Sequence, residues 1–264
     1  MKQTLFSVVA CLLLAGAVSA TPGAWKQLGK SGDWKNTVAA TAFGGALYTV
    51  ESNGVLYKTA LTTGGWVTLG KPEFGDTVWL ANDGASLYSL EKSGSLYKIS
   101  PQNGSWSRVG TSSDWGNTIA ADCSNGVLYS VETNGALYRT DLSTGQWKPV
   151  GKPEFGNTSF LAVGTGPIYT IEKDGSLYRI NPSDGSWSQV GAAGDWKGTT
   201  AAVVAQDTLY TVEASGTLYR TDLSTGKWQA LGKPEFADTV GIFASNGHLY
   251  TIEASGSLYE IDVN

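Results

Sequence analysis

The chain has 264 residues, and 34 of them are glycine, about one in eight against a usual share of roughly 7%. Ten Trp, twelve Tyr and seven Phe accompany a single Met and a single His, and charged residues make up only 16%. This composition indicates turn-rich β-structure with aromatic packing rather than helices, and it excludes a disordered chain. The formal net charge of −5 argues against nucleic-acid binding, which needs a basic surface.

The first twenty residues have the pattern of a secretory signal. Lys2 is followed by an apolar run over residues 5–14 and then by small residues that end at Ala20. We therefore expect cleavage near Ala20, export to the periplasm or the medium, and a mature domain over residues 21–264. A lipoprotein signal with Cys11 as the lipidated residue is an open alternative. The apolar run is shorter than the roughly 20 residues that span a membrane, and no later stretch approaches that length, so we expect no transmembrane segment.

One cysteine, Cys123, remains after such a cleavage. It has no intramolecular partner, so no disulfide framework supports the fold. Four of the five corresponding positions in the repeats described next are Ala or Val, and the fifth is Asn. We therefore interpret Cys123 as a buried structural thiol rather than a reactive one.

Six repeats fill the chain after residue 24. A Leu/Ile-Tyr pair with Glu three residues after the Tyr recurs every 40 or 41 residues, and a second Leu-Tyr follows nine residues later. A Gly-x-Trp motif closes each of the first five units. The Tyr residues of the first pair are Tyr48, Tyr88, Tyr129, Tyr169, Tyr210 and Tyr250. A fixed period of this length is typical of repeat folds with four strands per unit.

Each unit predicts four short antiparallel strands. In the first unit these cover residues 37–43, 46–51, 55–61 and 66–69, separated by Gly and Asn turns. Six such units predict an all-β fold, a six-bladed β-propeller. The last unit lacks its Gly-x-Trp strand, and Gly23-Ala24-Trp25 supplies one in phase. We therefore expect the N-terminal strand to complete the last blade and close the ring.

Consecutive units differ in the loop that follows the Trp strand, so the true repeat is about 81 residues long and occurs three times. One loop type carries Asp-Trp and the other carries Glu-Phe, and the up-and-down topology places both on the same face as the hairpins that follow the repeated Glu. Aromatic rings with a few polar groups suit neutral polar ligands, above all sugars. The ligand-binding candidates are therefore Asp33, Trp34, Asp114, Trp115, Asp195, Trp196, Phe74, Phe155 and Phe236.

The same loop aromatics are open to another interpretation, because they would also fill the gaps between neighbouring blades. We assign the Trp residues of the outer strands and the Leu-Tyr pairs to packing. The six repeated Glu residues could form a cation-binding ring, but hairpin contacts explain them as well.

No catalytic constellation is evident. The single histidine, His248, occupies a slot that holds five different residues in the other units, which is typical of a surface position. No other histidine is present to form a Ser-His pair or a histidine metal site. No phosphate-binding loop motif occurs either. We expect no enzymatic activity, no cofactor and no metal.

The repeat Trp-x-x-Leu/Val-Gly … Gly-x-Leu-Tyr-x-Val-Glu-x-x-Gly-x-Leu-Tyr-Arg/Lys resembles the tectonin and tachylectin class of propeller lectins, from Trp25 to Ile261. The resemblance implies shallow sugar pockets between adjacent blades, lined by loop aromatics, and it points to the Asp-Trp loops. Tectonin blades usually carry Val-Trp-Gly-Val-Asn where this chain has Leu-Tyr-Thr-Val-Glu. We expect a monomeric or weakly associating lectin whose partners are glycans or a glycosylated surface. The rival hypothesis is a protein–protein scaffold that binds no sugar.

Overall fold

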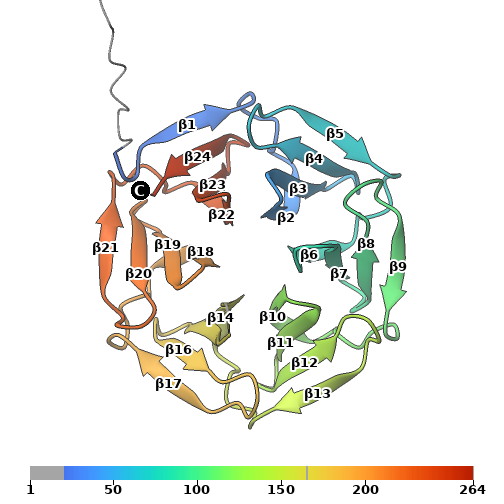
Figure 1. Ribbon diagram of the computed structural model, residues 1–264, viewed down its shortest axis with the longest axis vertical. Helices are drawn as coiled ribbons and strands as arrows, with labels where there is room; N and C mark the ends of the chain where they lie inside the picture. Colours follow the sequence, from blue (N-terminus) through green and yellow to red (C-terminus); the bar gives the residue numbers. More distant parts are fainter. Residues whose placement is uncertain (1–20, 165, 264) are drawn as a thin grey trace, which may run out of the picture.

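The computed structural model describes residues 21–164 and 166–263, so the predicted signal segment and Cys11 lie outside the described residues. Six antiparallel four-stranded sheets surround a central axis as a six-bladed β-propeller (Figure 1). The described residues contain strands and turns but no helix. The predicted fold class is confirmed.

The blades follow one another along the chain. Blade 1 comprises β2 (Thr37–Phe43), β3 (Ala46–Glu51), β4 (Leu56–Ala60) and β5 (Trp66–Leu69), and blade 2 comprises β6 (Thr77–Asn82), β7 (Leu87–Glu91), β8 (Leu96–Ile99) and β9 (Trp106–Val109). Blade 3 comprises β10 (Thr118–Ser124), β11 (Val127–Glu132), β12 (Leu137–Asp141) and β13 (Trp147–Val150), and blade 4 comprises β14 (Thr158–Val163), β15 (Ile168–Glu172), β16 (Leu177–Ile180) and β17 (Trp187–Val190). Blade 5 comprises β18 (Thr199–Ala205), β19 (Thr208–Glu213), β20 (Leu218–Asp222) and β21 (Trp228–Leu231). In the first unit, three predicted strands agree with the structure and the third is one residue shorter at each end.

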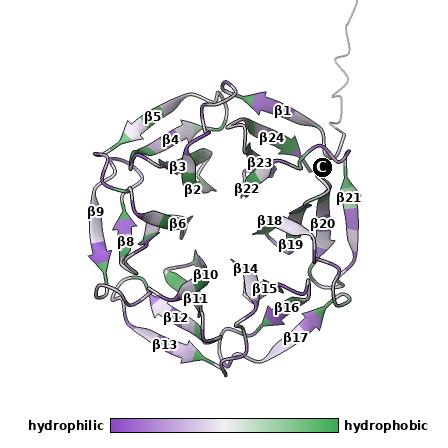
Figure 2. Cartoon of the chain, turned by 180° about the vertical axis from the view of Figure 1, so that it is seen from behind, coloured by the Kyte–Doolittle hydropathy of each residue, from purple (hydrophilic) through white to green (hydrophobic). Residues whose placement is uncertain are grey.

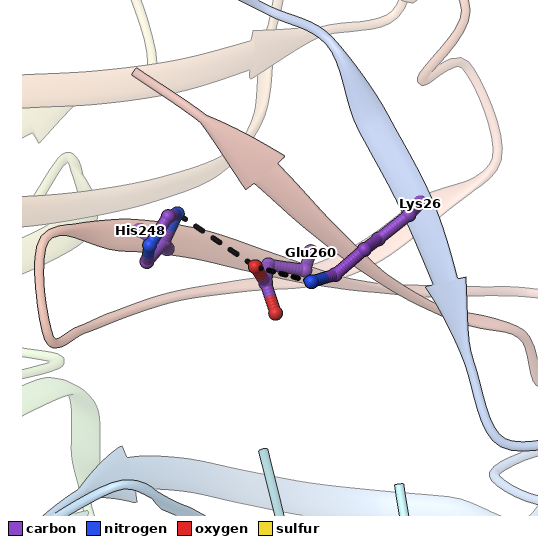
Figure 3. Close-up of polar contacts among 3 residues, drawn as sticks. All are labelled: Lys26, His248 and Glu260. Atoms are coloured by element: carbon purple, nitrogen blue, oxygen red, sulfur yellow. Dashed lines mark ion pairs between the residues drawn. The ribbon is translucent and has the colours of Figure 1, made fainter. Parts of the chain in front are cut away.

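Blade 6 joins the two ends of the chain. Its strands are β22 (Thr239–Ser245), β23 (His248–Glu253), β24 (Leu258–Asp262) and the N-terminal β1 (Trp25–Leu28). The register of β1 against β24 runs from Trp25 opposite Ile261 to Leu28 opposite Leu258, which confirms the predicted closure. Lys26 Nζ on β1 lies 3.0 Å from Glu260 Oε1 on β24, and His248 Nδ1 on β23 lies 3.8 Å from the same oxygen (Figure 3).

The hydrophobic core lies between blades rather than within one of them. One cluster joins Tyr48 and Val50 of β3 to Leu80 and Leu87 of the following blade, and comparable clusters recur around the ring. Each outer strand is solvent-exposed at its first three residues and buries only its last. Hydrophilic residues accordingly mark outer strands such as β9 (Figure 2).

Hydrogen bonds tie each interblade loop to the hairpin of the preceding blade, which confirms that both lie on one face. The backbone N–H of Trp115 donates to the Gly94 carbonyl, and that of Phe74 donates to Gly54. Gly94 has φ +79°, and a Cβ there would lie 2.4 Å from the backbone nitrogen of Gly116, so only glycine fits. We call this side the loop face and the other side the reverse face.

Cys123 is buried at 6% exposure on β10, as predicted. Burial raises the pKa of its thiol well above the ordinary value, and the neighbouring Asp122 adds to that rise. A thiol held in the neutral form is a weak nucleophile, consistent with a packing role.

Candidate functional site

Three small pockets occur at the three Asp-Trp loops, one in every second blade. Their volumes are about 200, 270 and 210 Å³ at Asp33, Asp114 and Asp195 respectively. Each is lined by the loop Asp and Trp, the hairpin Glu, a Tyr from the third strand and the Trp of the outer strand. The equivalent sets are Asp33, Trp34, Glu51, Tyr57 and Trp66; Asp114, Trp115, Glu132, Tyr138 and Trp147; and Asp195, Trp196, Glu213, Tyr219 and Trp228.

The loop tryptophans form the inner wall of these pockets. Trp34, Trp115 and Trp196 are only 3–4% exposed, and each packs against aliphatic side chains of the two blades that it separates. Most of each indole ring therefore packs between two blades, as the alternative interpretation expects, and only a small exposed part of it lines the pocket.

The loop aspartates support their own turns. Asp33 Oδ2 accepts a hydrogen bond from Lys30 N at 3.0 Å, and Asp114 Oδ2 accepts one from Thr111 N at 3.1 Å. Both carboxylates are otherwise solvent-exposed at the pocket rim. They are therefore held in place while keeping lone pairs free for a ligand.

The outer-strand tryptophans form the exposed wall of each pocket. From the sequence, only a packing role was expected for them. Trp66, Trp147 and Trp228 are 49–51% exposed, and each meets the third-strand Tyr edge to face with ring centroids 5.0–5.3 Å apart. A polar residue follows this Trp in five of the six outer strands, but the exposure itself depends on the edge position of the strand in the assembled blade.

One methylene group distinguishes the two blade types at this site. In the Glu-Phe blades the outer Trp donates its indole N–H to the loop Glu, at 3.0 Å for Trp106 to Glu73 and 2.8 Å for Trp25 to Glu235. In the Asp-Trp blades the corresponding acid is shorter, and the contact is 3.4 Å for Trp228 to Asp195. The longer carboxylate thus spans the gap that becomes a pocket in the Asp-Trp blades.

The loop phenylalanines lie elsewhere. Phe74, Phe155 and Phe236 are 2–3% exposed in the interblade clusters, and none of them lines the three pockets. Their burial favours the packing interpretation of the Glu-Phe loops.

The hairpin glutamates are part of the blade scaffold. Thr37 Oγ1 donates to Glu51 Oε1 at 2.7 Å, and Thr118 makes the same contact to Glu132. Burial raises the pKa of both carboxyl groups above the ordinary value. These partners favour the hairpin interpretation over a cation-binding ring.

Two residues that line the pockets carry buried hydroxyl groups. Thr59 lines the pocket at Asp33, and Ser130 lines the pocket at Asp114. Neither makes a hydrogen bond to any residue that the structure describes. Both hydroxyl oxygens are closed off from solvent, so they lie behind the pocket surface and belong to the blade interior.

The structure also places the remaining sequence candidates. His248 lies in blade 6 beside Glu260, and its side chain is 36% exposed. Among residues 21–164 and 166–263, no group of three or more His, Cys, Asp or Glu is arranged to hold a metal ion. The described part of the chain includes no helix of the length and apolarity that crossing a membrane requires.

Comparisons with known proteins identify the fold alone. No known family model matches the sequence, and no curated protein sequence matches it. A protein of unknown function from Bacteroides thetaiotaomicron is similar in structure, with TM-score 0.68 and 16% identity over 92% of this chain and 73% of that one. Virginiamycin B lyase from Staphylococcus aureus is also similar, with TM-score 0.63 and 13% identity over 91% of this chain and 99% of that one. YCF48 from Cyanidioschyzon merolae has TM-score 0.53 and 14% identity over 90% of this chain and 99% of that one.

Proposed function

We propose that this protein is a non-enzymatic carbohydrate-binding propeller that uses the three pockets at the Asp-Trp loops. The observation that supports the proposal most directly is the recurrence of one set of pocket residues at intervals of about 81 residues. An enzyme usually needs one asymmetric site, whereas three equal weak sites on a rigid disc give avidity for a repetitive surface.

The chemistry of the pockets suits a single sugar unit. Their volumes of 200–270 Å³ lie below the roughly 300–1,000 Å³ of sites for drug-sized ligands. The exposed face of an outer Trp offers an apolar surface to the C–H face of a sugar ring. The loop Asp carboxylate offers hydrogen-bond acceptors to the sugar hydroxyls.

The remaining parts of the proposal come from the sequence. The segment before Thr21 favours export, which would place the disc where glycans are displayed. The repeat pattern resembles the tectonin and tachylectin lectins, and we propose a relationship to that class.

The experiment is a glycan array with residues 21–264 and two triple variants. Trp66→Ala, Trp147→Ala and Trp228→Ala together remove the exposed wall of the three pockets. Trp25→Ala, Trp106→Ala and Trp187→Ala together are the matched control, because these tryptophans are 44–47% exposed on the other three outer strands. We expect the wild type and the control to bind the same glycans and the pocket variant to lose them.

Two results would contradict the proposal. One is the absence of any bound glycan for the wild type, and the other is equal loss of binding in both folded triple variants.

A protein-binding function is the second candidate, and one observation favours it. Every inner strand has a β-bulge next to its first Thr, and the bulged residue is exposed to solvent. In four neighbouring blades this residue is aliphatic and 37–61% exposed: Val240, Val38, Val78 and Ile119. Exposed apolar patches mark interaction sites, so failure of the array would direct the search to this arc.

A further inference from the structure

A further cavity lies on the reverse face, away from the three pockets. It has a volume of about 710 Å³, within the range of small-molecule sites, and is formed by blades 4 and 5. Its charged lining residues are Arg179 on β16, Arg220 and Asp222 on β20, and Asp207 and Lys227 at the turns of blade 5.

The two arginines belong to a row of cations that the repeat creates. In five blades the first Tyr of the unit stands opposite Lys or Arg on the third strand, namely Lys58, Lys98, Arg139, Arg179 and Arg220. In blade 6 the corresponding residue is Glu260. Two of these cations, both arginines, line the cavity.

Guanidinium donors remain free in the cavity. With its amide turned so that the oxygen faces Arg220, Gln229 accepts hydrogen bonds from Nε and Nη2 of that residue, which orients the guanidinium and leaves three of its five N–H groups. Arg179 makes no hydrogen bond or ion pair with any residue that the structure describes. A fixed guanidinium fork suits the oxygens of a carboxylate or a phosphate.

The two carboxylates of the cavity have different roles. Asp222 is engaged by its own turn, because Oδ1 accepts from Ser224 N, Ser224 Oγ and Thr225 N. Asp207 occupies a turn position that is glycine in four of the other five units and Ala85 in blade 2, and its carboxylate accepts no hydrogen bond from the described residues. It is therefore available to accept hydrogen bonds from ligand hydroxyls.

We propose that this reverse-face cavity binds a hydroxylated organic acid, with Arg179 and Arg220 on the acidic group and Asp207 on the hydroxyls. Sugar acids and sugar phosphates share this chemistry. The site is separate from the three Asp-Trp pockets, so it does not depend on their function.

Isothermal titration calorimetry tests the assignment with glucuronate, glucose 6-phosphate, glucose and inorganic phosphate. We expect glucuronate or glucose 6-phosphate to bind at least tenfold more tightly than glucose and than inorganic phosphate. Arg179→Gln and Arg220→Gln should each weaken that binding about tenfold or more, the usual effect of losing a charged hydrogen bond. Arg139→Gln is the matched control, because Arg139 holds the same position in blade 3 and does not line the cavity. It should change affinity less than twofold.

Further variants separate this proposal from the glycan-binding one. Asp33→Glu, Asp114→Glu and Asp195→Glu together alter the loop-face pockets, and this variant should bind the acidic sugar as the wild type does. Asp207→Asn should lower the preference for hydroxylated acids over inorganic phosphate. Equal binding of glucose, equal effects of all three arginine variants, or no heat with either acidic sugar would overturn the assignment.

Discussion

At the residue scale, the difference between Asp and Glu in one loop decides where a pocket opens. Glu73 reaches the indole N–H of Trp106, whereas Asp33 bonds back to Lys30 and leaves the space beside Trp66 open. The two residues occupy the same loop position, each 33 residues before its outer Trp. The alternation of the repeat therefore has a local physical cause in the length of one side chain.

Replacing Asp33, Asp114 and Asp195 together with Glu should close the three pockets and abolish glycan binding. The added methylene brings each carboxylate to the outer indole N–H, as in the Glu-Phe blades. Each change also gives up a turn hydrogen bond of about 0.5–1.5 kcal/mol, so the melting temperature falls and binding is measured well below it. Unchanged glycan binding by this variant would contradict the role assigned to the pockets.

Asp122 should make stability depend on pH between about 4 and 6. Its carboxylate accepts hydrogen bonds from Cys123 N and Val163 N, and burial raises its pKa to about 6, from about 3.9 in an unfolded chain. In this interval the folded state binds more protons than the unfolded state, so stability falls as pH rises. The contribution is at most about 3 kcal/mol, reduced by the water that reaches this half-buried side chain.

The test is chemical denaturation at several pH values for the wild type and Asp122→Ala. Alanine occupies the equivalent position in blades 2 and 4, as Ala81 and Ala162, so the variant should fold. Its stability should fall less steeply between pH 4 and 6, while the half-buried hairpin glutamates keep a slope of the same sign. Identical slopes for both proteins would show that Asp122 titrates normally.

At the element scale, the strands could be predicted because each depends on local pattern. Alternating apolar residues and Gly-containing turns predicted both ends of β2, β3 and β5 correctly. The position of Trp25, one repeat length before Trp66, predicted β1. The exposure of the aromatics could not be predicted in this way. Trp34 is buried and Trp66 is exposed because one lies between two blades and the other on an edge strand, and only the assembled ring determines this difference.

The closing strand β1 should depend on the charge pair between Lys26 and Glu260. The third-strand position is Lys or Arg in the other blades, so Glu260→Lys introduces a residue that the blade accepts but places two cations in register. Because Lys26 is 65% exposed and Glu260 only 14%, we expect a coupling of about 0.2–1 kcal/mol. His248 faces the same carboxylate and would add to the effect when protonated.

A double-mutant cycle in denaturant measures this coupling. Glu260→Lys should destabilise the protein, and the exchanged pair Lys26→Glu with Glu260→Lys should recover part of the loss. Additive effects of the two substitutions would mean that the pair does not contribute to closure.

At the scale of the whole molecule, closure depends on strand pairing that does not require a continuous chain. In blade 6, β1 and β24 come from opposite ends of the sequence yet pair over four residues, as the outer strands do elsewhere. The core lies between blades, so each blade depends on two neighbours for burial. The ring is thus built from three copies of one two-blade unit. If the chain is divided just before an outer strand, the last blade of each copy is completed by the first strand of the next copy.

A single unit should therefore assemble into the ring by itself. Residues 105–185 begin before β9, include β10–β16 and end before β17. In a trimer, β9 of each copy can pair as the outer strand beside β16 of the next, and three copies satisfy all six blades by closed threefold symmetry. Light scattering after size exclusion should give three times the chain mass, with a melting temperature that rises with concentration. A folded monomer or an open series of larger polymers would show instead that the pseudo-threefold repeat is not sufficient to determine closure.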